Sequence, residues 1–144
     1  MTPKLDHPLR VALDIGGVMS KYPDVIRAFA RALLDGGALI YVITDMPRHD
    51  EVMQMLATND FGFIQAEYVH CADYKAYGEG CKAELLAALE IDLVLDDCLG
   101  YMAIPGRTVR CLVMPDATQP YWHPTWDAGL ANSIDFGRRV YRKP

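Results

Sequence analysis

Carboxylate, hydroxyl and ammonium side chains stand next to short apolar segments of this chain. The residues concerned are Asp14 after 10–13, Thr44 after 38–43, Lys82 at the start of a segment of helix formers, and Asp96 and Asp97 after 91–95. If those segments are parallel strands, their carboxyl ends meet at one edge of a sheet, and these groups converge there. Carboxylates offer the oxygen ligands that Mg²⁺ prefers. A lysine and a hydroxyl can hold phosphate oxygens and offset charge as a phosphoryl group transfers.

The elements that would position these groups alternate between strand and helix. Residues 25–34 have helical spacing of apolar side chains, with Pro23 and Asp24 as a start signal and Gly36 and Gly37 as a stop. Further segments predict helices at 50–57 and 82–90 and strands at 63–69 and 108–114. This alternation predicts an α/β fold, a three-layer Rossmann-like parallel sheet with helices on both faces.

The length favours one domain over the whole chain, 1–144. At 144 residues the chain is long enough for a substantial core. We expect that core within about 10–114, followed by an irregular, aromatic-rich segment at 115–144. The intervals 17–44 and 44–82 leave no room for a large cap domain over the predicted site.

Composition excludes some classes of protein. A formal net charge of -5 argues mildly against a dedicated nucleic-acid binder. The four cysteines show no zinc-binding spacing, and we interpret them as reduced thiols. No segment resembles a signal peptide or approaches the ~20 apolar residues of a membrane span. We therefore expect a cytoplasmic protein without membrane association.

Taken in order, the four segments resemble the motifs of the haloacid dehalogenase (HAD) superfamily. They are Asp14-Ile-Gly-Gly-Val18, Thr44 after Tyr41-Val-Ile43, Lys82, and Asp96-Asp97 after Leu93-Val-Leu95. The resemblance covers about residues 10–114. The short interval between Lys82 and Asp96 is similar to that of small uncapped members such as polynucleotide 3′-phosphatase domains.

The resemblance implies a role for each matching residue. Asp14 would be the nucleophile that accepts a phosphoryl group as an aspartyl-phosphate. Thr44, together with Asp45, would bind the phosphoryl oxygens, and Lys82 would neutralise Asp14 and the phosphate. Mg²⁺ would be ligated by Asp14, Asp96, Asp97 and the backbone carbonyl of Gly16. The substrate would be a phosphomonoester: a small metabolite, a protein or a nucleic-acid end. An oligomeric state is not implied.

Gly16 departs from the family pattern. Hydrolases of this superfamily usually carry a second aspartate at this position, as the general acid and base. Such assistance is typically worth about 10²–10⁴-fold, so glycine predicts a slow or specialised phosphatase. Substrates with good leaving groups would need less help, or Asp45, His49 or His123 would substitute. The chain would otherwise be a catalytically lapsed HAD-fold protein that binds or regulates.

Two further alternatives stay open. Lys75 also precedes the helix at 82–90 and competes with Lys82 as the phosphate-binding ammonium. A receiver-like phospho-acceptor domain uses similar chemistry, but receivers group their acidic pair near the first strand. Here the pair Asp96-Asp97 follows the fourth predicted strand, which favours the HAD-type arrangement.

Overall fold

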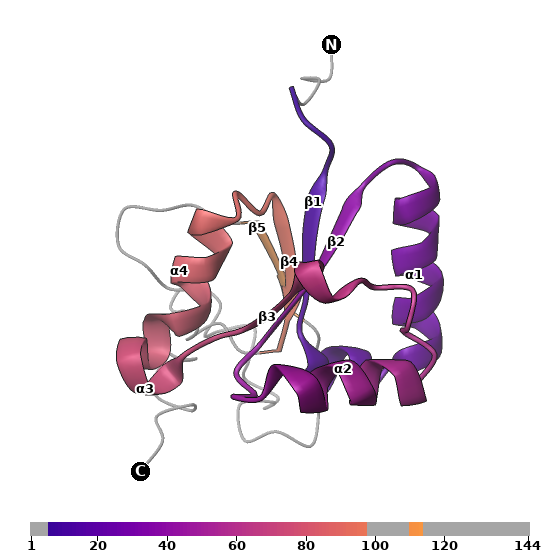
Figure 1. Cartoon of the computed structure of the whole chain (residues 1–144). Coiled ribbons are helices and arrows are strands. Elements are labelled where there is room, and N and C mark those ends of the chain that lie inside the picture. The colour runs from indigo at the N-terminus through magenta and orange to yellow at the C-terminus, as the bar shows by residue number, and fades with distance from the viewer. Residues whose placement is uncertain (1–5, 98–109, 114–144) are drawn as a thin grey trace, which may run out of the picture.

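The computed structural model describes residues 6–97 and 110–113 (Figure 1). The predicted segment 115–144, His123 and Cys98 lie outside the described residues. Within the described residues, five strands and four α-helices, joined by three short helical turns, follow in chain order: β1 (Arg10–Leu13), η1 (Ile15–Met19), α1 (Pro23–Asp35), β2 (Leu39–Thr44), α2 (His49–Thr58), η2 (Ala66–Tyr68), β3 (Val69–Cys71), α3 (Tyr74–Tyr77), η3 (Gly78–Gly80), α4 (Cys81–Ala88), β4 (Leu93–Asp96) and β5 (Arg110–Val113).

The described strands form one parallel sheet in the order β3-β2-β1-β4-β5. The chain builds outward from β1 through β2 to β3 and then returns across β1 to β4. The direction of the strand order therefore reverses between β1 and β4. Open α/β sheets bind their ligands at such a switch point, beyond the carboxyl ends of the two strands. The predicted α/β fold with a parallel sheet is confirmed.

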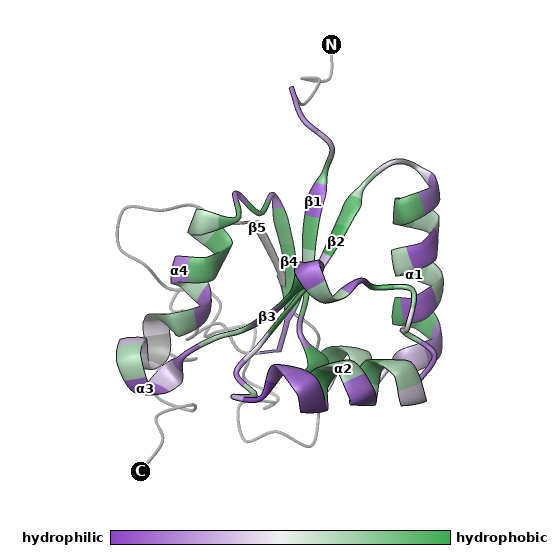
Figure 2. Cartoon of the chain, in the orientation of Figure 1, coloured by the Kyte–Doolittle hydropathy of each residue, from purple (hydrophilic) through white to green (hydrophobic). Residues whose placement is uncertain are grey.

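Helices cover both faces of the sheet. Val11 and Leu13 of β1 pack in one core with side chains of α1 and α2, among them Ile26 and Val52. Ala12 points the other way and packs with Leu86 of α4 and with Val94. Because neighbouring residues of a strand face opposite sides, a strand covered on both faces is apolar throughout. Figure 2 shows this hydrophobic character along β1, β2 and β4.

The ends of α1 follow from its sequence. Pro23 is the first helical residue, where its missing N–H costs nothing. At the other end Gly37 has a φ of +90°, and its N–H donates to the carbonyl of Leu34 at 2.9 Å. This left-handed closure ends the helix and returns the chain directly into β2.

One predicted element was misplaced. The strand expected at 63–69 occupies Val69–Cys71, after a turn in which the Ile64 N–H donates to the carbonyl of Phe61 at 3.0 Å. The apolar side chains of Phe61 and Ile64 are buried in the core from this turn rather than from a strand. The shift places the end of β3 beside the end of β2, where Thr44 pairs with Cys71.

None of the helices in the described part of the chain combines the length and the apolar character needed to span a bilayer.

Candidate functional site

Asp14 stands directly beyond β1, held by its own backbone. Its N–H donates to the carbonyl of Leu95 in β4 at 3.0 Å, and its carbonyl accepts from the N–H of Met19 at 3.2 Å. The residue keeps the extended conformation of the strand, with φ -81° and ψ 155°. Its side chain is only 8% exposed. The backbone thus fixes this carboxylate at the switch point of the sheet.

The two glycines after Asp14 have different structural roles. Gly17 has a φ of +72°, and a Cβ built there would overlap the Asp97 carboxylate, with the Asp97 Cβ only 2.9 Å away. Gly16 has a φ of -65° and is exposed, and a Cβ built there would meet nothing within 4 Å. The fold therefore requires glycine at position 17 and leaves position 16 open to a side chain.

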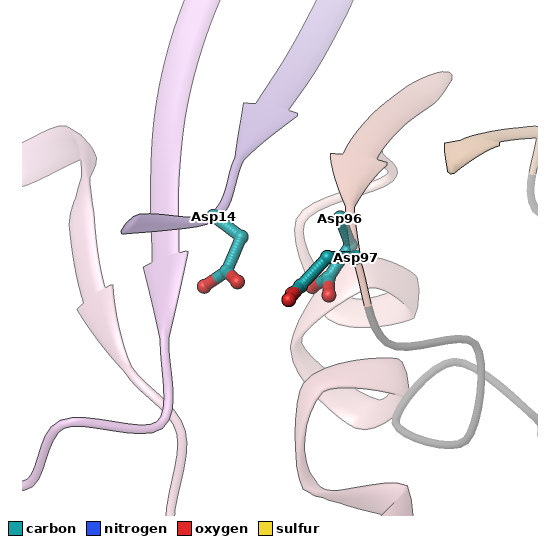
Figure 3. Close-up of side chains that lie close together, drawn as sticks. All are labelled: Asp14, Asp96 and Asp97. Carbon is teal, nitrogen blue, oxygen red and sulfur yellow. The ribbon is translucent and has the colours of Figure 1, made fainter. Parts of the chain in front are cut away.

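Asp96 and Asp97 approach Asp14 from the neighbouring strand. Asp96 is the last residue of β4 and is 1% exposed, whereas Asp97 follows the strand and is half-buried. Figure 3 shows both side chains facing Asp14 across the gap between the two strand ends. One carboxylate oxygen from each of the three residues lies within 4.8 Å of the other two.

Lys82 lies in the first turn of α4 and brings a positive charge to this cluster. Its Nζ donates to Oδ1 of Asp14 at 2.8 Å and to Oδ2 of Asp96 at 2.9 Å. The Lys82 side chain is 2% exposed, so its hydrogen bonds to the two carboxylates largely replace water. A buried ammonium is tolerated when it is paired and hydrogen-bonded in this way.

The charges of the cluster do not balance. Burial and the nearby Asp96 carboxylate raise the pKa of Asp14 to about 8, and Lys82 only partly opposes this shift. Burial and Asp96 also raise the pKa of Asp97 to about 6. For Lys82, the cost of burial is outweighed by Asp96 and Asp14, and the pKa of its ammonium is raised. Three carboxylates against one ammonium leave a negative surplus, which a hard cation with oxygen ligands would offset.

Thr44 ends β2 and is 1% exposed. Its hydroxyl oxygen accepts a hydrogen bond from the N–H of Met46 at 3.2 Å, and its carbonyl accepts from the N–H of Ala72 at 2.6 Å. Asp45, the next residue, is half-buried and lines a cavity of about 520 Å³ at the ends of β2 and β3. Thr44 thus ends β2 and Asp45 follows it, while Asp14 follows the adjacent strand β1.

The competing residues lie elsewhere. Lys75 is exposed on α3 and lines the same cavity as Asp45, whereas Lys82 contacts Asp14 and Asp96. His49, a proposed substitute acid, is exposed at the start of α2, with its Nε2 3.2 Å from the carbonyl oxygen of Ala66. The charged groups that act on Asp14 are Asp96, Lys82 and Asp97.

Sequence reasoning missed the role of Gly17 and the cavity beside Asp45. The adjacent glycines Gly16 and Gly17 were a signal, but the sequence alone does not show which of them contacts Asp97, the residue after β4. The cavity depends on where β3 ends, and that strand was misplaced. The chain matches no family model, and no curated protein or solved structure matches it significantly.

Proposed function

We propose that this chain is a Mg²⁺-dependent phosphohydrolase of the HAD type that acts on a phosphomonoester through an aspartyl-phosphate. The observation that carries this proposal is the position of the Lys82 ammonium, 2.8 Å from Asp14 and 2.9 Å from Asp96 at the switch point of a parallel sheet. A buried lysine between two carboxylates is costly for a structural role alone. In a site that also holds a phosphate dianion, the same ammonium would neutralise the ligand, which offsets this cost.

The donor set fits Mg²⁺. Asp14, Asp96 and Asp97 would hold it through carboxylate oxygens, together with the backbone carbonyl of Gly16. When bound, Mg²⁺ supplies charge neutralisation for the phosphoryl oxygens. The surplus negative charge around Asp14 supports this assignment, because the same surplus would repel a phosphate in the absence of a cation.

The residues of the chain would divide the reaction between them. A carboxylate oxygen of Asp14 forms a bond to phosphorus while the bond from phosphorus to the leaving alkoxide breaks, and the alcohol takes a proton from solvent. Lys82 stays hydrogen-bonded to Asp14 and orients it. The Thr44 hydroxyl, fixed by the Met46 N–H, donates to a phosphoryl oxygen. Water then attacks phosphorus, the bond from phosphorus to the Asp14 oxygen breaks, and the proton of the water passes to solvent, which leaves free phosphate and the Asp14 carboxylate.

A second candidate function has one observation in its favour. Gly16 supplies no general acid, which would slow both steps by about 10²–10⁴-fold. This favours a catalytically lapsed HAD-fold protein that binds a phosphorylated ligand without turnover. A cytoplasmic location is part of the same proposal. So is the substrate class, on which the cavity beside Asp45 bears.

The test is turnover of p-nitrophenyl phosphate with and without Mg²⁺. The proposal expects Mg²⁺-dependent release of p-nitrophenol that falls at least about 10³-fold in Asp14→Asn, because the nucleophile is lost. Asp92→Asn is the matched control. Asp92 accepts a hydrogen bond from the backbone of Arg10 at the opposite edge of the sheet, so its rate should stay within about twofold.

Trapping separates the two candidate functions. Beryllofluoride with Mg²⁺ should form an adduct at Asp14, detected by ¹⁹F NMR, in either case. An adduct with no turnover of aryl, acyl or nucleotide phosphates would favour the lapsed binder. Absence of both the adduct and turnover at saturating concentrations would overturn the assignment of Asp14 as a phosphoryl acceptor.

A further inference from the structure

A cavity of about 520 Å³ adjoins the candidate site on the side of β2 and β3. Its described lining consists of Asp45, Pro47, Cys71, Ala72, Asp73, Tyr74 and Lys75. This volume is in the range of about 300–1,000 Å³ that small-molecule pockets occupy. Of these residues, only Asp45 was assigned a role in binding the phosphoryl group above.

The cavity lies beside the proposed phosphoryl site. Asp45 follows Thr44 directly, and Ala72 is joined to Thr44 by the 2.6 Å hydrogen bond from its N–H. On the other side, the Asp45 carboxylate lies near enough to Cys81 to help burial raise the pKa of that thiol. Cys81 precedes Lys82 in α4. The cavity therefore lies next to Thr44 and to the start of α4, the two places that would hold the phosphate.

The lining chemistry restricts what can enter. Asp45 and Asp73 bring two carboxylates and Lys75 brings one ammonium, so the described lining has a formal negative surplus. One oxygen of Asp73 accepts from the N–H of Ala76 at 3.0 Å, which fixes the carboxylate on α3. Carboxylates accept hydrogen bonds, and they favour ligands that donate them. Nucleic-acid sites instead gather cationic side chains along the backbone.

From this placement, and resting on the proposed phosphohydrolase function, we propose that the cavity binds the leaving group of the substrate. That group is a small alcohol with hydrogen-bond donors, hydroxyl or ammonium. The substrate class is thus a small phosphorylated polyol or amino alcohol. A phosphorylated protein and a nucleic-acid end are the other outcomes of the test.

The experiment compares kcat/KM for five substrates with Mg²⁺. They are glucose 6-phosphate, phosphoethanolamine, a phosphoserine peptide, a 3′-phosphorylated oligonucleotide and p-nitrophenyl phosphate as the reference. We expect the better of the two small phosphoesters to exceed the peptide and the oligonucleotide by at least about tenfold. A higher kcat/KM for the peptide or the oligonucleotide would overturn the assignment of the cavity.

Asp73→Asn probes the cavity directly. Asparagine keeps an oxygen that can accept the Ala76 N–H, so the start of α3 is preserved while the charge is removed. We expect kcat/KM for the small phosphoester to fall about tenfold further than for p-nitrophenyl phosphate, mainly through KM. Asp60→Asn is the control, because Asp60 is exposed outside the cavity with a φ of 62° that asparagine tolerates. Equal losses on both substrates in Asp73→Asn would refute the proposal.

Failure of the proposed function would be recognised separately. If no phosphoester is turned over, calorimetric titration of the small phosphoesters into the wild-type chain with Mg²⁺ still tests the cavity. Binding that weakens about tenfold in Asp73→Asn but not in Asp60→Asn supports the cavity and leaves only the hydrolysis wrong. Absence of binding, or binding that Asp73→Asn does not change, overturns the cavity assignment itself.

Discussion

Charged side chains lie at both ends of the parallel strands. They are partly exposed at the amino edge, where the strands begin, and buried at the carboxyl edge, where the strands end. At the amino edge, Arg10 donates to Glu90 at 2.8 Å and to the carbonyl of Leu89 at 3.0 Å, and Nε2 of His7 lies 3.0 Å from Asp92. The side chains of Arg10 and Glu90 are 25% and 73% exposed. At the carboxyl edge, Lys82 and its two carboxylate partners are almost fully buried.

The difference separates two kinds of charged cluster by their exposure to water. The amino-edge contacts join residues 79 or more positions apart, and their side chains are partly exposed, so they brace the sheet with little desolvation. The carboxyl-edge cluster excludes water and has more negative than positive charge. Such a cluster lowers the stability of the chain by itself. A ligand that supplies positive charge removes that penalty.

Replacing the cationic side chain at each edge, Lys82 or Arg10, gives the largest expected difference in the free energy of unfolding. Lys82→Met leaves two buried carboxylates unpaired and should cost about 3–5 kcal/mol in the free energy of unfolding. Arg10→Met, at the amino edge, should cost about 1 kcal/mol, because its partner Glu90 stays in water. Urea unfolding of both variants without metal measures the two values. Equal losses would show that the two edges do not differ in the way described.

Gly16→Asp tests what the carboxyl edge lacks. Position 16 is exposed, has an ordinary φ of -65° and has open space for a side chain. An aspartate there can protonate the leaving group and activate water, so we expect kcat for a phosphomonoester with a poor leaving group to rise about 10²-fold. Gly16→Asn, which has the same shape without the acid, is the control. A similar rise in both variants would exclude acid–base assistance as the cause.

Gly17→Ala and Gly16→Ala form a matched pair on adjacent residues. Alanine at position 17 must adopt a left-handed φ and displace the Asp97 carboxylate, at a cost of about 2 kcal/mol in the free energy of unfolding. Alanine at position 16 should change stability by less than about 0.5 kcal/mol. Thermal unfolding measures both. Equal stabilities would mean that the contact between Gly17 and Asp97 is not a constraint on the fold.

Bound metal and pH should both change the stability that the carboxyl-edge cluster confers. The folded state binds protons at Asp14 and Asp97 with pKa values of about 8 and 6, above the ordinary 3.8, so it holds more protons than the unfolded state in between. Stability without metal should therefore fall as the pH rises from about 4 to 8.

Mg²⁺ competes with those protons. It should add about 1.4 kcal/mol at pH 8 when its free concentration is ten times its Kd, and much less at pH 5. Thermal shifts at both pH values with Mg²⁺ or EDTA measure this, and Asp97→Asn should reduce the shift. A shift that is independent of pH would contradict it.

Much of the site was predictable because parallel sheets align the ends of their strands. Thr44 and Asp96 end apolar strands and Asp14 follows one, so their position at one edge of the sheet followed from the fold class. The pairing of Lys82 with Asp14 and Asp96 required only that its helix precede β4. Their chemical roles stay predictions, as do Mg²⁺ and the phosphoester.

Other features could not be read from local patterns. The brace between His7 and Asp92 joins residues 85 positions apart, and no short-range signal marks it. The start of β3 depends on how Phe61 and Ile64 fill the core, which is a property of tertiary packing. The cavity beside Asp45 depends in turn on that strand.

The contact between Gly17 and Asp97 has an evolutionary consequence. Neighbouring codons should be under opposite constraints: position 16 is free to gain or lose a side chain without disturbing the backbone. Position 17 can change only together with position 97, which is distant in sequence. In descendants of this chain we expect residue 16 to vary freely, while residues 17 and 97 change as a pair or stay unchanged.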